Sequence, residues 1–222
     1  MPASNPAAVF LSASLMLVLP PSCGSAPAPA GGTAVSPGAA LDSLLCARES
    51  VRSYADSSLS FEEVQKLLWA GGGLLPDGRR TIPSAGALYP LRFLLVSGEV
   101  DGLAPGVYRY ETADSSLIPV REGDARRELA TACLGQPWVL DAPASIVIAA
   151  EASITTDHYG ERGVRYVFME AGHASQNIYL ECAAMGLGTV AVGAFLDSSV
   201  AVATGLRPGE MALYVMPVGR IE

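Results

Sequence analysis

The sequence predicts an α+β domain, in which helices are mixed with a β-hairpin and a buried strand. Residues 106–110 alternate in polarity, turn at 113–115 and return at 117–120, which is typical of a hairpin. Residues 144–150 are apolar on both faces, as a central strand requires. These observations favour α+β over a doubly wound parallel sheet, and the sequence contains no GxGxxG phosphate loop.

The first half of the folded region is expected to begin with two helices. Residues 41–50 carry apolar side chains at helical spacing. The second helix is marked at both ends, because residues 60–63 form a capping box and three glycines at 71–73 stop it. A buried strand is expected at 92–96, before the hairpin.

One long amphipathic helix over 163–185 dominates the second half. Its apolar positions recur at helical spacing along one face. The preceding residues 156–162 are interpreted as a charged loop punctuated by glycines. The other expected elements are helices at 122–134 and 198–204 and strands at 189–192 and 212–218.

The composition indicates one domain of ordinary size, expected over residues 41–222. The chain has 222 residues, of which 50% are hydrophobic, so a substantial core can be buried. With a net charge of -8, the chain lacks the excess of basic residues that is typical of a nucleic-acid binder, and no nucleic-acid partner is expected.

The amino-terminal region is expected to be separate from the domain. Residues 7–19 are apolar but shorter than the roughly 20 residues of a spanning helix, and they fit the apolar part of an export signal over 1–23. Cys23 is a candidate for lipidation, which would give the only membrane association expected. Residues 24–40 are rich in Ala, Pro, Gly and Ser and predict a flexible linker. A periplasmic or lipid-anchored protein is therefore expected; the lack of basic residues before Arg48 leaves a cytoplasmic location as the alternative.

The sequence predicts no metal site. Its two histidines, His158 and His173, lack carboxylates or cysteines at metal-ligand spacing. His173 falls on the long helix near Glu170 and Asn177 by helical spacing, so a hydrogen-bonded structural role is expected for it.

A loop at residues 80–90 is a candidate for ligand binding. Pro83 and Pro90 bracket it, and Gly86 permits tight backbone geometry. Such a loop can present backbone amides and the Ser84 hydroxyl to a ligand. A structured turn leading into the next strand is the equally compatible alternative.

A second candidate cluster comprises Arg48, Ser50 and Arg52. The two arginines are four residues apart and would share a face of a helix that continued this far. Two guanidinium groups and a hydroxyl suit a phosphate group. Surface ion pairing is the alternative role for arginines in an acidic chain.

Seven short motifs occur in a fixed order along the chain. They are RESVRSY at 48–54, PSAGALYP at 83–90, GERGVRY at 160–166, EAGHASQN at 170–177, GLG at 186–188, VGAF at 192–195 and PVGR at 217–220. Together they resemble the FMN-dependent nitroreductase superfamily, and specifically its SagB-type dehydrogenases, which are related to thiazole- and oxazole-forming oxidases. The resemblance covers about residues 41–222.

The resemblance implies a nitroreductase-like fold, with a mainly antiparallel sheet flanked by helices, in a homodimer that binds FMN at its interface. By position, Arg48 and Ser50 would hold the phosphate, Arg52 would lie near the ribityl chain and pyrimidine edge, and Arg220 would assist at the phosphate. The residues that would approach the ring, from the other subunit, are Pro83, Ser84 and Ala85. The residues that would line the ring are Val192, Gly193 and Ala194.

The resemblance also locates the expected chemistry at His158 and Tyr159. In azoline-oxidising relatives a lysine–tyrosine pair precedes the GERG-like segment. Tyr159 matches the tyrosine, whereas His158 replaces the lysine. A histidine can act as a base near neutral pH, although it lacks the reach and permanent charge of lysine. An exposed loop position for His158 and a packing role for Tyr159 are the alternatives.

The predicted function is that of an FMN-dependent oxidoreductase, in which a donor reduces the flavin by hydride transfer and an acceptor reoxidises it. The substrate would be a small molecule or a peptide, with NAD(P)H as a possible donor. One alternative is an azoline dehydrogenase of a peptide-modifying system. Others are a non-catalytic flavin or small-ligand binding protein tethered at the membrane, and a scaffold that binds no flavin.

Overall fold

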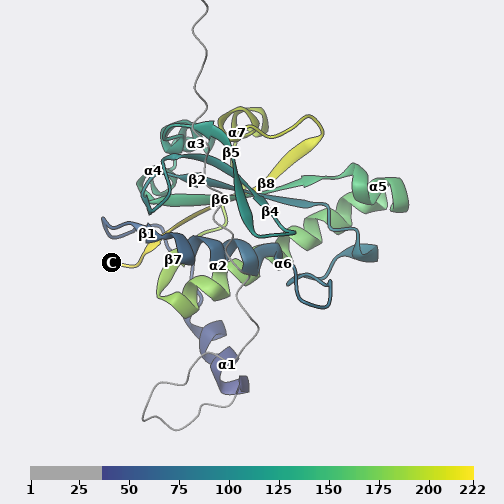
Figure 1. Cartoon of the computed structure of the whole chain (residues 1–222), viewed down its shortest axis with the longest axis horizontal. Coiled ribbons are helices and arrows are strands. Elements are labelled where there is room, and N and C mark those ends of the chain that lie inside the picture. Colours follow the sequence, from purple (N-terminus) through teal and green to yellow (C-terminus); the bar gives the residue numbers. More distant parts are fainter. Residues whose placement is uncertain (1–36) are drawn as a thin grey trace, which may run out of the picture.

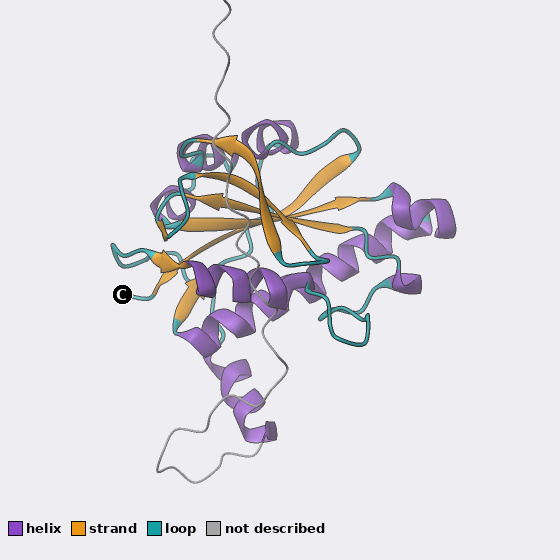
Figure 2. Ribbon diagram, viewed as in Figure 1, coloured by secondary structure: helices purple, strands orange, loops and turns teal. Residues whose placement is uncertain are grey.

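The computed structural model describes residues 37–222 and contains a six-stranded sheet (Figures 1 and 2). The strand order is β5-β4-β2-β6-β8-β7, and each neighbouring pair is antiparallel. The strands are β2 (Leu91–Ser97), β4 (Gly106–Glu111), β5 (Ser116–Glu122), β6 (Ala144–Glu151), β7 (Leu187–Thr189) and β8 (Glu210–Arg220). A short parallel pair joins β1 (Leu59–Ser60) to β3 (Val100–Asp101). The predicted α+β class, the hairpin and the central strand are confirmed.

Helices cover both faces of this sheet (Figure 1). The α-helices are α1 (Pro37–Ala47), α2 (Phe61–Gly72), α3 (Arg126–Ala132), α4 (Pro137–Asp141), α5 (Ser153–Tyr159), α6 (Arg162–Met185) and α7 (Asp197–Thr204), and a short 3-10 turn covers Ala85–Ala87. Within residues 37–222, no helix has the length and apolar character needed to cross a membrane. The predicted export segment 1–23 and most of the linker 24–40 lie outside the described residues.

Alternate residues of the central strands supply two separate cores. On β2 and β6, the side chains of Phe93, Leu95, Ile146 and Ile148 pack with α2 and α6. The intervening residues, Leu94, Val96, Val147 and Ala149, pack with α3, α4 and α7 on the opposite face. The two-sided apolar character of these strands follows from this arrangement, because each strand must fill a core on both faces.

The predicted capping box at the start of α2 is present. The Ser60 hydroxyl accepts from the Glu63 amide (3.2 Å), and the Glu63 carboxylate accepts from the Ser60 amide (2.8 Å). The helix ends at Gly72, where the backbone lies against the ring of Phe93. A Cβ atom at Gly72 would approach that ring to 2.5 Å, so the glycine is required for packing as well as for helix termination.

Four sequence predictions about element boundaries require correction. The helix expected at 122–134 begins only at Arg126, because residues 116–122 remain in β5 and Asp124 accepts from the Arg126 amide (3.0 Å). The loop expected at 156–162 is mostly helix α5, which ends at Gly160 with φ +59°. The strand expected at 189–192 ends at Thr189, and Val192 forms only an isolated bridge with β8. Helix α1 begins at Pro37, inside the predicted linker.

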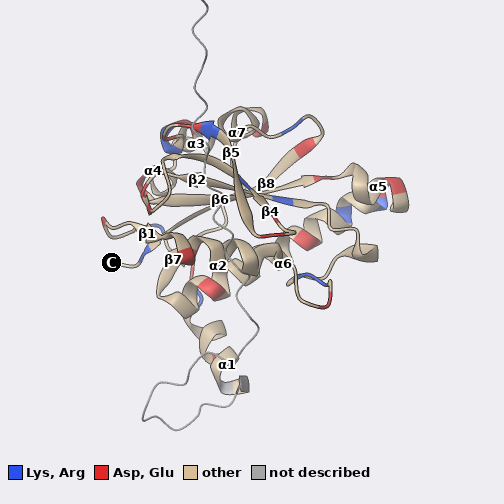
Figure 3. Cartoon of the chain, viewed as in Figure 1, with Lys and Arg blue, Asp and Glu red and all other residues tan. Residues whose placement is uncertain are grey.

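Arg109 and Glu210 form a buried ion pair across non-neighbouring strands, β4 and β8. Two hydrogen bonds of 2.9 and 2.8 Å join the guanidinium to the carboxylate, and each side chain is only 4% exposed. Burial alone would raise the pKa of Glu210, but the bonds from Arg109 and the Arg207 amide outweigh it and lower that pKa. Most other charged residues lie on helices, in loops or near strand ends (Figure 3).

We predict that Glu210→Ala will destabilise the fold by about 3–5 kcal/mol, because it leaves the Arg109 charge buried without its partner. The measurement is the free energy of unfolding from urea titration. Asp77→Ala, which removes the exposed partner of Arg79, is the control and should have little effect. Equal effects of the two substitutions would contradict the prediction.

Candidate functional site

The first candidate cluster is organised by Tyr179 of α6. Its hydroxyl accepts from the Ala191 amide (2.8 Å) and lies 3.1 Å from the Ser50 hydroxyl. The Arg48 guanidinium lies 5.4 Å from the centre of the Tyr179 ring. Tyr179 therefore joins the 48–52 segment to the chain that leaves β7. Sequence reasoning did not identify it as a site residue, since a tyrosine within an amphipathic helix carries no distinctive signal.

The segment after Ser50 is held against the end of the sheet by close backbone contacts. The Val51 amide donates to Thr189 (2.9 Å), and the Ala55 amide donates to Arg220 (3.0 Å). A Cβ atom at Gly188 would lie 2.6 Å from Val51, and one at Gly219 would lie 2.8 Å from Tyr54. The glycines of the GLG and PVGR motifs are therefore needed where this segment crosses β7 and β8.

The arginines of this cluster differ in their partners. Arg52 lies 5.7 Å from the centre of the Trp138 ring and donates to the Ser50 carbonyl (3.4 Å). Neither Arg48 nor Arg52 forms an ion pair with any residue in the described part of the chain. Arg220 differs, because its guanidinium is paired with Glu63 at 3.1 Å. The structure thus brings Arg48, Ser50 and Arg52 together and directs Arg220 toward the capping box of α2.

The segment predicted to line a flavin ring, residues 192–194, directly follows Ala191, whose amide is bonded to Tyr179. Val192 is buried and exchanges two backbone hydrogen bonds with Val215, whereas Gly193 and Ala194 are exposed. The Gln136 side chain donates to the Ala194 carbonyl (2.9 Å) and to Cys133 (2.8 Å). Gln136 therefore fixes this exposed segment from the turn after α3, a role that the sequence did not reveal.

The second candidate cluster contains the 83–90 loop and Tyr159. The Ser84 hydroxyl accepts from the Tyr89 amide (2.9 Å), and both Ala87 and Tyr89 have positive φ angles, 53° and 51°. Positive φ is uncommon outside glycine and is often found at functional sites. A Cβ atom at Gly86 would lie 2.8 Å from the Tyr159 hydroxyl. The loop is therefore a structured element packed against the end of α5.

Tyr159 and His158 lie at the end of α5. The Tyr159 ring makes edge contacts with His158 (4.5 Å between centroids) and with Tyr166 (5.2 Å). His158 is exposed and Tyr159 is half-buried. Both residues are thus on a helix rather than in the expected loop, because Gly160 provides the break between α5 and α6.

Glu170 lies beneath this loop and is 3% exposed. Burial raises the pKa of its carboxyl, while Ser84 and the charge of Arg80 act in the opposite direction. Its Oε1 atom has no hydrogen-bond partner among the described residues.

The structure contradicts the expected structural role of His173, which is exposed. Asn177 instead donates to the Ala70 and Thr81 carbonyls (3.1 Å each).

The two clusters contact α6 at different positions. Tyr179 and Glu170 are nine residues apart on this helix, which corresponds to about 13–14 Å along its axis. Within one chain, the 83–85 loop and the 48–52 segment thus approach α6 about two and a half turns apart.

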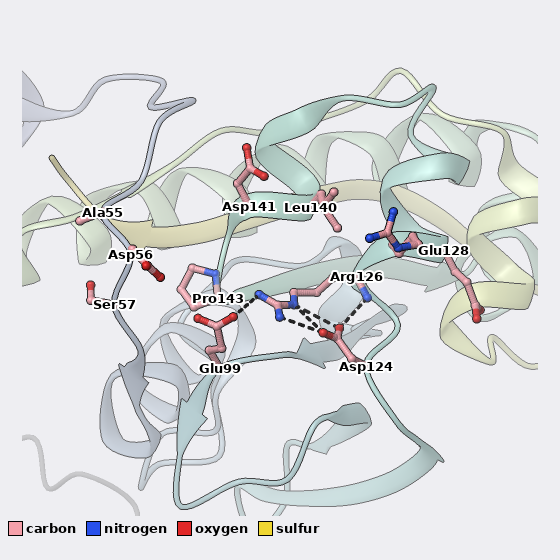
Figure 4. A pocket seen from close by; sticks show the side chains of 11 residues that line it. Ala55, Asp56, Ser57, Glu99, Asp124, Arg126, Glu128, Leu140, Asp141 and Pro143 are labelled. Atoms are coloured by element: carbon pink, nitrogen blue, oxygen red, sulfur yellow. Dashed lines mark hydrogen bonds and ion pairs between the residues drawn. The ribbon is translucent and has the colours of Figure 1, made fainter.

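A hollow of about 530 Å³ has none of the candidate site residues in its lining (Figure 4). Two arginines line it: Arg126 is paired with Glu99 (2.9 Å) and Asp124 (2.8 Å), and Arg127 is exposed. Asp56, Asp141 and other polar residues complete the lining. Because Arg126 is already paired with two carboxylates and Arg127 is exposed on α3, we assign no binding or catalytic role to this hollow.

Comparison with known proteins identifies the family. The nitroreductase family model matches residues 45–220. A curated protein of Methanocaldococcus jannaschii, named as a candidate nitroreductase, is 41% identical over 181 residues, which cover 81% of this chain and 90% of the relative. The chain belongs to the nitroreductase family, whose members are oxidoreductases.

Solved structures agree with this assignment. A candidate nitroreductase of Anabaena variabilis has a TM-score of 0.71 and 28% identity; the match covers 82% of this chain but only 39% of that one. A candidate nitroreductase of Ralstonia eutropha has a TM-score of 0.73 and 25% identity, with 93% and 89% of the two chains covered. The nitroreductase-like fold predicted from the motifs is confirmed.

We predict that Glu170→Gln will increase stability at neutral pH. Because the pKa of Glu170 is raised in the folded state, its contribution to stability is fully present below the unfolded value, about 4.3, and is lost as the pH rises above it. The neutral glutamine removes this loss. The measurement is the midpoint of urea unfolding as a function of pH. Glu161→Gln, at an exposed position, is the control, and a difference between Glu170→Gln and wild type that does not grow with pH would refute the prediction.

Proposed function

We propose that this protein is an FMN-dependent oxidoreductase that transfers hydride between the flavin and a small organic or peptide substrate. The family assignment supports redox chemistry. The observation that carries the cofactor proposal is the group formed by Arg48, Ser50 and Arg52. The two arginines have no carboxylate partner in the described chain, and the serine between them is exposed. This group matches the needs of a phosphate ester.

The residues near this cluster also fit a planar ring. Gly193 and Ala194 are exposed, and a Cβ atom at Gly193 would meet only Tyr214, at 3.9 Å. Backbone can therefore approach a flat ligand closely at Gly193. Gln136 would hold this wall in place, since it bonds to the Ala194 carbonyl. When bound, FMN would supply the hydride-accepting centre.

We further propose that the working enzyme is a homodimer. The separation of the 83–85 loop from the 48–52 segment supports this arrangement, because Pro83, Ser84 and Ala85 of one chain would approach the flavin held by its partner. Val164, Phe168 and Met169 give α6 an exposed apolar surface, which is suited to contact with a second chain.

In the proposed mechanism, Tyr159 and His158 act on the substrate. The Tyr159 hydroxyl, packed beside Gly86, would orient the substrate at the loop. The exposed His158 imidazole would accept or return the proton that accompanies hydride transfer, since an imidazole can act as a general base and as a general acid. Any NAD(P)H would be bound directly over the flavin, because the sequence lacks a GxGxxG nucleotide-binding loop.

We predict that the purified protein will be yellow, will lose flavin absorbance on addition of NADPH, and will bind FMN less tightly after Arg48→Ala. Loss of a charge-assisted phosphate contact should weaken FMN binding by about 10- to 100-fold, as measured by fluorescence titration of the apoprotein. Arg127→Ala, an exposed arginine on α3, is the matched control. A colourless protein that stays apo when mixed with FMN would overturn the proposed function.

We predict that His158→Ala and Tyr159→Phe will each retain FMN affinity and lower turnover, by about 100-fold if His158 acts as the general base. The measurement is steady-state reduction of an acceptor, together with the pH dependence of kcat/KM. Asp157→Asn, on the same helix, is the control. Unchanged turnover in His158→Ala would assign that residue to the helix surface alone.

A further inference from the structure

A cavity of about 360 Å³ at the ends of β2 and β4 gathers four arginines in an otherwise acidic chain. They come from four segments: Arg80 begins the 80–90 loop, which contains the 83–90 motif, Arg92 is on β2, Arg109 is on β4, and Arg207 precedes β8. The other lining residues are Leu91, Tyr110, Glu111, Thr112 and Ala113. With a net charge of -8 for the whole chain, this concentration of positive charge is local.

Only two of these arginines have carboxylate partners. Arg109 is bonded to Glu210 (2.8 Å) and Arg92 to Glu151 (3.2 Å). Arg80 and Arg207 have no ion pair within 4.0 Å anywhere in residues 37–222. Their guanidinium groups therefore line the cavity without a carboxylate at ion-pair distance, and Glu210 and Glu170 attract Arg207 and Arg80 only at longer range.

The setting of Arg80 favours an anion. Its guanidinium lies 4.7 Å from the centre of the Tyr89 ring, which limits its orientation. Burial and the nearby charge of Arg92 lower the pKa of Arg80, so like charges are crowded here. Glu170 attracts Arg80 from outside the cavity, and Glu111 is the acidic residue in the lining. Neither forms an ion pair with Arg80 in the described chain.

We propose that this cavity binds an oxyanion, the phosphate or carboxylate group of a small ligand, between Arg80 and Arg207. Guanidinium groups present paired donors that match such groups, and Thr112 in the lining adds a hydroxyl donor. The site is distinct from the Arg48 cluster, because no residue is shared between them. Arg80 contacts the 83–90 loop through Tyr89, so an occupied site would also stabilise the loop beside Tyr159.

The test is a calorimetric titration of the full chain, saturated with FMN, with inorganic phosphate at constant ionic strength. Saturation fills the Arg48 cluster; if FMN does not bind, the same titration is made in an Arg48→Ala background. Arg80→Gln and Arg207→Gln should each weaken phosphate binding by about tenfold or more, because each removes a charge-assisted contact. Arg127→Gln should bind phosphate as wild type does.

The outcomes separate this proposal from the flavin function, since phosphate binding is read without turnover. Equal affinity in wild type, Arg80→Gln and Arg207→Gln, or no phosphate binding by wild type, would overturn the proposal. Arg207→Gln alters an exposed loop residue, so its result stands even where Arg80→Gln disturbs the loop.

A second measurement identifies the source of the anion. The KM values of wild type, Arg80→Gln and Arg207→Gln are compared for two acceptors, the anionic 4-nitrobenzoate and the neutral 4-nitrobenzamide. If phosphate binding is lost and KM rises only for the nitrobenzoate, the anionic group belongs to the redox substrate. If phosphate binding is lost while both KM values are unchanged, a free anion occupies the site. Both results support the cavity as an oxyanion site.

Discussion

The packing of α6 against the sheet is the constraint on which both candidate clusters depend. Val167, Ala171, Ala174, Ile178 and Cys182 are buried along one stripe of this helix. Burial of each larger aliphatic side chain contributes about 1.5–3 kcal/mol, so the rotation and position of α6 are firmly set. With that stripe inward, Glu170 is placed beneath the 83–90 loop and Tyr179 beside Ser50. A shift of the helix would displace both clusters together.

Close backbone contacts also fix the first candidate cluster, at Arg48, Ser50 and Arg52, relative to the sheet. Gly188 and Gly219 let the chain at Val51 and Tyr54 cross the end of β7 and β8 without a side chain between them. The Tyr54 hydroxyl lies 3.1 and 3.2 Å from the Val51 and Pro217 carbonyls, and burial raises its pKa strongly. Arg48, Ser50 and Arg52 are therefore attached to rigid strands, although they belong to an irregular segment.

The sequence predicted elements well where the periodicity was strong and poorly where glycine had two interpretations. The capping box at Ser60 and the two-sided strand at 144–150 were recognisable because local chemistry determines them. Gly160, in contrast, suggested a loop but separates two helices, so the position of His158 on α5 was missed. Tyr179 and Gln136 could not be found from the sequence, because their partners, Ala191, Ser50 and Ala194, are distant in the chain. His173 was misassigned since helical spacing alone does not determine which face is buried.

The arginines show how the chain divides positive charge between structure and binding. Lys66 is the only lysine, so nearly every cation is a planar guanidinium that can both pair with a carboxylate and stack on a ring. Arg109, Arg126 and Arg220 are neutralised by acidic partners and hold elements together. Arg48, Arg52 and Arg80 instead stack on Tyr179, Trp138 and Tyr89 without a carboxylate partner in the described chain. An aromatic ring orients a guanidinium while leaving its charge available, which is the property that an anion-binding residue needs. The three stacked arginines therefore belong to the two proposed anion sites, and the guanidinium of Arg207, the second arginine proposed to bind the anion in the cavity, has neither an aromatic nor a carboxylate partner in the described chain.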